Sequence, residues 1–199
     1  MFWACNNNTC SRASEIKNSD RVIVGSLRKE SYNLKTANAL IALAPDSLSL
    51  ELLNITNLPM FNEDLEATPP NEWVEFRKQI INADGLLFLT PEYNRSVPGV
   101  LKNAIDVGSR PYIQNSWAGK PAAIVSVSTG NISGFGANHH LRQSMVFVNV
   151  ATMAQPEAYI GGAATLFDDK GKLTNDSTKA FLNSFMAAFE KWVDTNAQK

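Results

Sequence analysis

Apolar residues along the chain form two alternating kinds of pattern. Short, nearly continuous apolar runs predict strands at residues 21–25, 48–54, 84–94 and 120–130, with a short fifth strand inside 150–162. Leu86 to Leu89 are apolar without any polar alternation, which is typical of a parallel strand covered on both faces. Stretches with apolar residues at three- and four-residue spacing separate these runs and predict helices.

The helical stretches carry their own start and stop signals. Leu34, Ala37, Ile41 and Ala44 share one face of a predicted helix over 31–44, which stops at proline 45. Further helices are expected from about 69 to 83, from about 96 to 110, over about 137–149 and over about 176–195. The pair Thr68–Pro69 predicts an N-cap and first helical residue for the second helix. The apolar stripes of the second and last helices are Trp73, Phe76 and Ile80, and Phe181, Phe185, Phe189 and Trp192.

Five strands alternating with five helices predict an α/β fold: one parallel sheet with helices on both faces, in a three-layer sandwich. The expected strand order is 2-1-3-4-5. Residues 20–199 then form a single domain, preceded by a flexible tail over residues 1–19. Ligands of such sheets bind outside the carboxyl ends of the strands, where the first and third strands lie side by side.

Composition narrows the class of partner. The formal net charge is −1 over 199 residues, which argues against nucleic acid, because binding a phosphate backbone needs a basic surface. No run reaches the roughly 18 apolar residues of a membrane span, so no membrane partner is expected. The two cysteines fall within the first ten residues and no targeting signal is evident, so we expect a cytoplasmic protein with reduced thiols.

The loop after the first strand, within "VIVGSLRKESYN", is suited to an anion. Ser26 and Ser31 offer hydroxyls, Asn33 an amide and Arg28 a fork of donors, all beside a helix N-terminus. The alternative is ordinary capping by Ser31 and a solvated arginine. The chain has no G-x-x-x-x-G-K-[ST] motif, and no G-x-G-x-x-G follows this strand. These absences leave a single phosphate monoester as the best fit.

Two more loops are expected at the same edge of the sheet. "TPEYNRSVPG" presents the flat ring of Tyr93 and the amide of Asn94, and "SVSTGNISGFG" places Ser128, Thr129 and Gly130 after the fourth strand. Each loop alone could be an ordinary turn. Together, a phosphate grip and a platform for a planar ring favour flavin mononucleotide (FMN).

The motifs "GSLRKESYN", "LTPEYNRSVPGVLKNAID" and "HLRQ" resemble the NADPH-dependent FMN reductase family, nearest to its bacterial quinone/chromate reductase branch. The resemblance runs from about residue 21 to 162. It implies a flavodoxin-like fold, bound FMN, NADPH or NADH as co-substrate, a small-molecule electron acceptor, and a homodimer or homotetramer. It also implies that the FMN phosphate is contacted by Ser26, Arg28, Ser31 and Asn33, with Tyr32 in the same turn. One side of the flavin ring would be contacted by Pro91, Glu92, Tyr93 and Asn94. The other edge of the ring would be lined by Ser128, Thr129 and Gly130.

Two positions depart from the family's usual pattern. An aromatic residue often follows "PEYN", where this chain has Arg95, and an arginine often stands where it has Gly136. We hypothesise that Arg95 restores a positive charge at the entrance of the expected FMN site. It would bind a phosphate of the nicotinamide cofactor or act across a subunit interface. The alternative is that Arg95 is simply a solvated arginine. His139 and His140 are not read as metal ligands, because neighbouring helical residues point about 100° apart.

No nucleophile or acid–base pair suggests a catalytic side chain, and a flavin enzyme does not need one. The resemblance implies an NAD(P)H-dependent reductase that passes hydride to FMN and then two electrons to quinone, chromate, azo or similar acceptors by a ping-pong mechanism. The alternatives are a non-enzymatic FMN electron carrier and a redox-sensing flavoprotein. A glycosyl- or phosphoryl-transfer enzyme is disfavoured, because the sequence offers no carboxylate pair or metal set for it.

Overall fold

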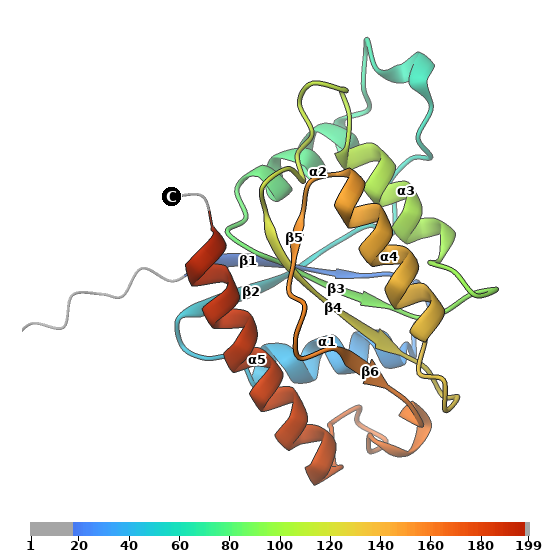
Figure 1. Ribbon diagram of the computed structural model, residues 1–199. Helices are drawn as coiled ribbons and strands as arrows, with labels where there is room; N and C mark the ends of the chain where they lie inside the picture. The colour runs from blue at the N-terminus through green and yellow to red at the C-terminus, as the bar shows by residue number, and fades with distance from the viewer. Residues whose placement is uncertain (1–17, 198–199) are drawn as a thin grey trace, which may run out of the picture.

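The computed structural model describes residues 18–197 and places them in one twisted sheet between two layers of helices (Figure 1). The strands are β1 (Asn18–Val24), β2 (Leu48–Leu53), β3 (Leu86–Thr90), β4 (Pro121–Val127), β5 (Ala151–Thr152) and β6 (Ala158–Ile160). The helices are α1 (Tyr32–Ala42), α2 (Asn71–Ile81), α3 (Gly99–Gly108), α4 (Phe135–Phe147) and α5 (Asp176–Asn196), with 3-10 turns at Glu63–Leu65 and Ala163–Thr165.

The predicted sheet order is confirmed: β2-β1-β3-β4-β5, with every pair parallel. The predicted fifth strand is instead two short strands, β5 and β6, which pair with the first and second halves of β4. Pro156 lies between them, and proline cannot donate a hydrogen bond to the sheet. The edge of the sheet beside β4 is therefore interrupted.

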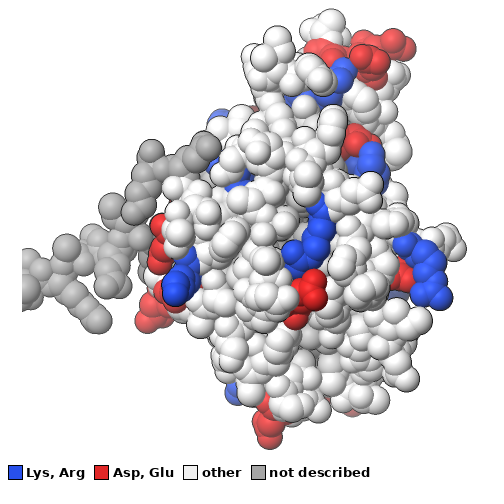
Figure 2. All heavy atoms as spheres, in the orientation of Figure 1, with Lys and Arg blue, Asp and Glu red and all other residues white. Residues whose placement is uncertain are grey.

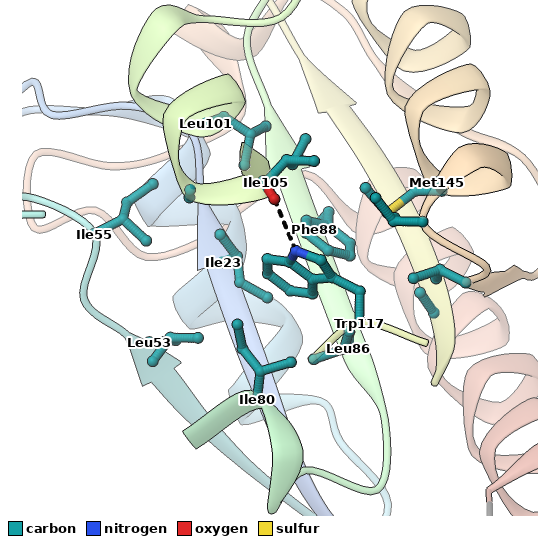
Figure 3. Packing of buried hydrophobic residues seen from close by; sticks show 14 of the residues in the cluster. Ile23, Leu53, Ile55, Ile80, Leu86, Phe88, Leu101, Ile105, Trp117 and Met145 are labelled. Carbon is teal, nitrogen blue, oxygen red and sulfur yellow. Dashed lines mark hydrogen bonds between the residues drawn. The ribbon is translucent and has the colours of Figure 1, made fainter. Parts of the chain in front are cut away.

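Alternate residues of the central strands face two separate cores. Ile23, Leu86 and Phe88 point toward α2, α3 and α4, whereas Val22 and Leu87 point toward α1 and α5. All five are fully buried. Figure 3 shows the first core, where the indole Nε1 of Trp117 donates to the Ile105 carbonyl at 3.0 Å. The continuous apolar runs of the sequence thus arise because both faces of the sheet are covered.

Several predicted boundaries were wrong. β1 begins at residue 18 rather than 21, β3 ends at Thr90 rather than 94, and β4 ends at residue 127 rather than 130. α2 begins at Asn71 with Pro70 as N-cap, not with Thr68, because a residue that precedes a proline is disfavoured in helical conformation, and Pro69 precedes Pro70. The predicted tail lies outside the described residues except for its last two positions, which start β1.

Candidate functional site

Three loops meet at the carboxyl ends of β1, β3 and β4, as the predicted topology requires (Figure 1). They enclose an open cleft of about 290 Å³. Ten residues singled out in the sequence line it: Ser26, Arg28, Ser31, Tyr32, Asn33, Pro91, Glu92, Tyr93, Ser128 and Thr129. Segments about a hundred residues apart in the chain thus share one surface.

The β1–α1 loop places hydroxyls and a cation around the start of α1. The Ser31 hydroxyl accepts from the Leu34 amide at 3.3 Å, so Ser31 does cap the helix. The guanidinium of Arg28 lies 5.0 Å from the centre of the Tyr32 ring and donates to the Glu30 carbonyl. Capping leaves the Ser31 hydroxyl proton available, and Arg28 is exposed and needs no large rearrangement to meet an anion.

Asn33 provides a test of what the cleft can hold. Its Nδ2 donates to the Val127 carbonyl at 3.4 Å. Its Oδ1 is buried and has no hydrogen-bond partner among the described residues. A buried acceptor without a partner costs free energy, so the position fits a ligand that brings a hydroxyl donor. The sugar-alcohol chain of FMN carries such hydroxyls, and its phosphate matches the donors of the neighbouring loop.

The β3–α3 loop turns sharply at its tip. Tyr93 and Ser96 exchange two backbone hydrogen bonds of 3.0 Å, and Asn94 and Arg95 both have left-handed backbone, with φ of 52° and 64°. This is the pattern of a type I′ turn. The turn leaves Tyr93 in the cleft, with 52% of its surface exposed, and carries Asn94 and Arg95 to the outside.

Three of the predicted site residues do not line the cleft: Asn94, Arg95 and Gly130. Whether they bind the cofactor stays a prediction. Val127 also lines the cleft, and the sequence analysis did not predict it. An apolar residue at the end of a buried strand is usually a core residue. Its position directly before Ser128 could have indicated that it borders the site.

One charged group far from the cleft has an unusual environment. Asp20 lies near the start of β1, at the end of the strand remote from the cleft. Burial and the nearby Asp84 raise its pKa to about 7. Within residues 18–197, no group of three or more His, Cys, Asp and Glu could hold a metal ion, and no helix has the length and apolar character to cross a membrane. Figure 2 shows acidic and basic side chains mixed over one face of the molecule.

A doubly wound parallel sheet of this order, with a cleft at its switch point, defines the flavodoxin-like class of proteins. A flavodoxin from Pseudomonas aeruginosa shares this fold, with a TM-score of 0.56 at 15% identity. The model of the NADPH-dependent FMN reductase family matches residues 21–165. The chain therefore belongs to that family.

Relatives and solved structures agree with this assignment. A quinone reductase from Pseudomonas putida is 62% identical over 176 residues, covering 88% of this chain and 94% of the relative. A 2-hydroxy-1,4-benzoquinone reductase from a Burkholderia species is 43% identical and covers 86% and 94%. The structure of FerB, a flavoenzyme NAD(P)H:(acceptor) oxidoreductase from Paracoccus denitrificans, superposes with a TM-score of 0.86 at 41% identity and covers 91% and 100%. The protein is an oxidoreductase that uses FMN and NAD(P)H.

Proposed function

We propose that the protein catalyses the two-electron reduction of a quinone by NAD(P)H in a ping-pong reaction at the cleft. The proposal rests on one observation. Residues of the β1–α1 loop, which we expect to bind phosphate, and residues of the β3–α3 loop, which we expect to contact the flavin ring, line the same cleft. Chromate and azo compounds are further acceptors that an open site would admit. We place the reaction in the cytoplasm, which supplies NAD(P)H.

FMN, when bound, would supply the redox chemistry, with hydride coming from NAD(P)H and two electrons going to the acceptor. The chain's part is to bind and orient. Ser26, Ser31 and Arg28 hold the phosphate at the α1 N-terminus. The Asn33 Oδ1 would accept from a hydroxyl of the sugar-alcohol chain, and its expected role as a phosphate ligand stays a prediction.

The two walls of the cleft orient the ring. Pro91 and Tyr93, from the β3–α3 loop, and Ser128 and Thr129, from the loop after β4, all line the cleft, and we take these two loops as its walls. Because the cleft is open, donor and acceptor can reach the same face of the ring in turn. One shared face for two substrates is the physical basis of the proposed ping-pong order.

The test is an anaerobic titration followed by steady-state kinetics. Purified protein reconstituted with FMN should bleach on addition of NADPH and recover colour on addition of benzoquinone. Initial rates at several benzoquinone concentrations should give parallel double-reciprocal lines. Intersecting lines would exclude the ping-pong order, and a preparation that binds no FMN would exclude the function.

Arg95 remains a candidate for contact with the nicotinamide cofactor. Its side chain is 74% exposed, and its Nη1 lies 3.4 Å from Oε1 of Glu92, which lines the cleft. We propose that it meets a phosphate of NADPH or a second subunit. Arg95→Ala should raise the KM for NADPH or weaken assembly, and a variant unchanged in both would refute the idea.

We also propose that the chain forms a homodimer or homotetramer. Val146 and Phe147, at the end of α4, are 76% and 83% exposed. Large apolar side chains this exposed favour contact with a partner. Light scattering of the purified protein would measure the mass, and Phe147→Ser should shift it toward the monomer.

A further inference from the structure

The start of α4 lacks a cap of its own. Gly134 is the N-cap residue, has left-handed backbone with φ of 73°, and has no side chain to accept from the first turn. The first amides of a helix have no partner within the helix. Side-chain oxygens of a Ser, Thr, Asp or Asn at the N-cap usually meet the amide two or three residues on. α4 must therefore be capped from elsewhere.

Glu92 supplies that cap from the β3–α3 loop. Its Oε2 accepts from the Ala137 amide at 3.1 Å, and Ala137 is the third residue of α4. The side chain of Glu92 is only 13% exposed. A carboxylate at a helix N-terminus is stabilised by the helix dipole and by a charge-assisted hydrogen bond. Glu92 also lines the cleft, so its expected contact with the flavin ring stays a prediction beside this capping contact.

The residue before Ala137 leaves room for this carboxylate. A Cβ at Gly136 would lie 3.0 Å from Glu92 Oε2 and 3.1 Å from the Arg95 carbonyl oxygen. Both contacts are closer than ordinary van der Waals distance. A side chain at this position would therefore press on both the carboxylate and the turn. The glycine that departs from the family's arginine is thus matched to the position of Glu92.

A second contact joins the same two segments. The Oγ of Ser96 lies 3.0 Å from the Nδ1 of His140, so the β3–α3 loop meets α4 one turn further along the helix. The Arg95 guanidinium, whose side chain is 74% exposed, lies 3.4 Å from the other Glu92 oxygen, Oε1; it adds little, because a partner open to solvent contributes weakly to stability. The partly buried hydrogen bond from the Ala137 amide to Glu92 is the main link.

We propose that Glu92 is a positioning residue whose carboxylate caps α4 and thereby holds the two walls of the cleft at a fixed spacing. The β3–α3 loop supplies Pro91 and Tyr93, and the loop that leads into α4 supplies Ser128 and Thr129. The hydrogen bond at Ala137 ties the first of these loops to the helix into which the second loop leads. The proposal rests on the proposed function, since it concerns the spacing of a ring-binding site.

The experiment compares Glu92→Gln with Glu92→Ala. Glutamine keeps an oxygen that can accept from the Ala137 amide, whereas alanine removes it. Glu75→Ala is the matched control, because Glu75 is an exposed glutamate on α2. The first readout is hydrogen exchange of the Ala137 amide in the full chain without added flavin. The second is the FMN dissociation constant from a fluorescence titration.

Loss of a cap accelerates opening of the first turn by about tenfold. Glu92→Ala should therefore speed exchange at Ala137 and weaken FMN binding, each by about tenfold. In both measurements Glu92→Gln should stay within about threefold of wild type. Glu75→Ala should match wild type. Unchanged exchange in Glu92→Ala would overturn the proposal. So would a Glu92→Gln variant that binds FMN as poorly as Glu92→Ala, because an oxygen that accepts from the Ala137 amide would then not be enough to hold the cleft.

Gly136→Ala gives an independent variant that keeps Glu92. Its added methyl group should displace the carboxylate and speed exchange at Ala137 in the same direction; exchange at the wild-type rate would count against the cap. A wild-type chain that protects Ala137 but binds no FMN would refute the proposed function and leave the cap standing. The two failures are therefore distinguishable.

Discussion

Replacing Asp20 by asparagine should change how the stability of the protein depends on pH. Asp20 is fully buried in β1, and both its carboxylate oxygens lack hydrogen-bond partners among the described residues. Burial and the negative charge of Asp84 raise its pKa from 3.8 to about 7, although Arg21 opposes the shift. The folded chain therefore retains this proton over a pH range in which the unfolded chain has lost it.

The sign and size of the effect follow from this difference. The pKa of Asp20 is higher in the folded chain than in the unfolded chain. The stability that protonated Asp20 contributes is therefore fully present below pH 3.8 and is lost as the pH rises to about 7. Each pH unit between the two pKa values costs about 1.4 kcal/mol, so the whole loss is about 4 kcal/mol. About 3 kcal/mol of it falls between pH 5 and pH 8. Asp20→Asn removes the ionisation and with it this loss.

Urea unfolding of both proteins at pH 5 and pH 8 measures the effect. The free energy of unfolding of wild type should fall by about 3 kcal/mol more than that of Asp20→Asn over this interval. Asp169→Asn, at an exposed position near the C-terminal side of the fold, should behave like wild type. Equal pH dependence in wild type and Asp20→Asn would refute the reasoning, whatever the absolute stability of the variant.

Three further changes test the core and the cleft. Trp117→Ala removes a fully buried indole that packs 5.8 Å from both Phe76 and Phe88, measured between ring centres; it should cost about 4 kcal/mol in urea unfolding, and a loss under about 1 kcal/mol would contradict the packing. Ser31→Ala removes the α1 cap and should lower stability by about 1 kcal/mol and weaken FMN binding; FMN affinity equal to wild type would exclude a phosphate contact. Asn33→Asp should weaken FMN binding by more than about tenfold, because it removes the Nδ2 donor to the Val127 carbonyl and leaves an unpaired buried charge in the cleft; unchanged affinity in a calorimetric titration would contradict the place assigned to Asn33.

The sequence predicted the sheet order well because the relevant signals are local. A continuous apolar run such as 86–89 marks a strand covered on both faces, and the helices between such runs leave few possible connections. The loops at the strand ends follow from that order, which is why ten of the thirteen expected site residues line one cleft. The boundaries were less accurate where two signals competed, as at Pro69 and Pro70.

What the sequence could not predict depends on contacts between distant segments. Glu92 and Ala137 are 45 residues apart, and no spacing rule relates a loop glutamate to the first turn of a later helix. The burial of Asp20 has the same cause: a charged residue at the start of a strand looks exposed until α5 covers it, with Val193 and Phe189 among the core residues on that side. The type I′ turn at Asn94 and Arg95 was hidden because arginine rarely adopts left-handed backbone.

The interrupted edge strand formed by β5 and β6 affects how readily the protein can aggregate through its sheet. Unpaired backbone groups along a sheet margin invite strands from other molecules to add on. Here that margin consists of pieces of two and three residues separated by Pro156. A strand from another molecule would find too few consecutive backbone hydrogen-bonding groups to pair stably. The interruption therefore disfavours edge-to-edge association and fibril formation.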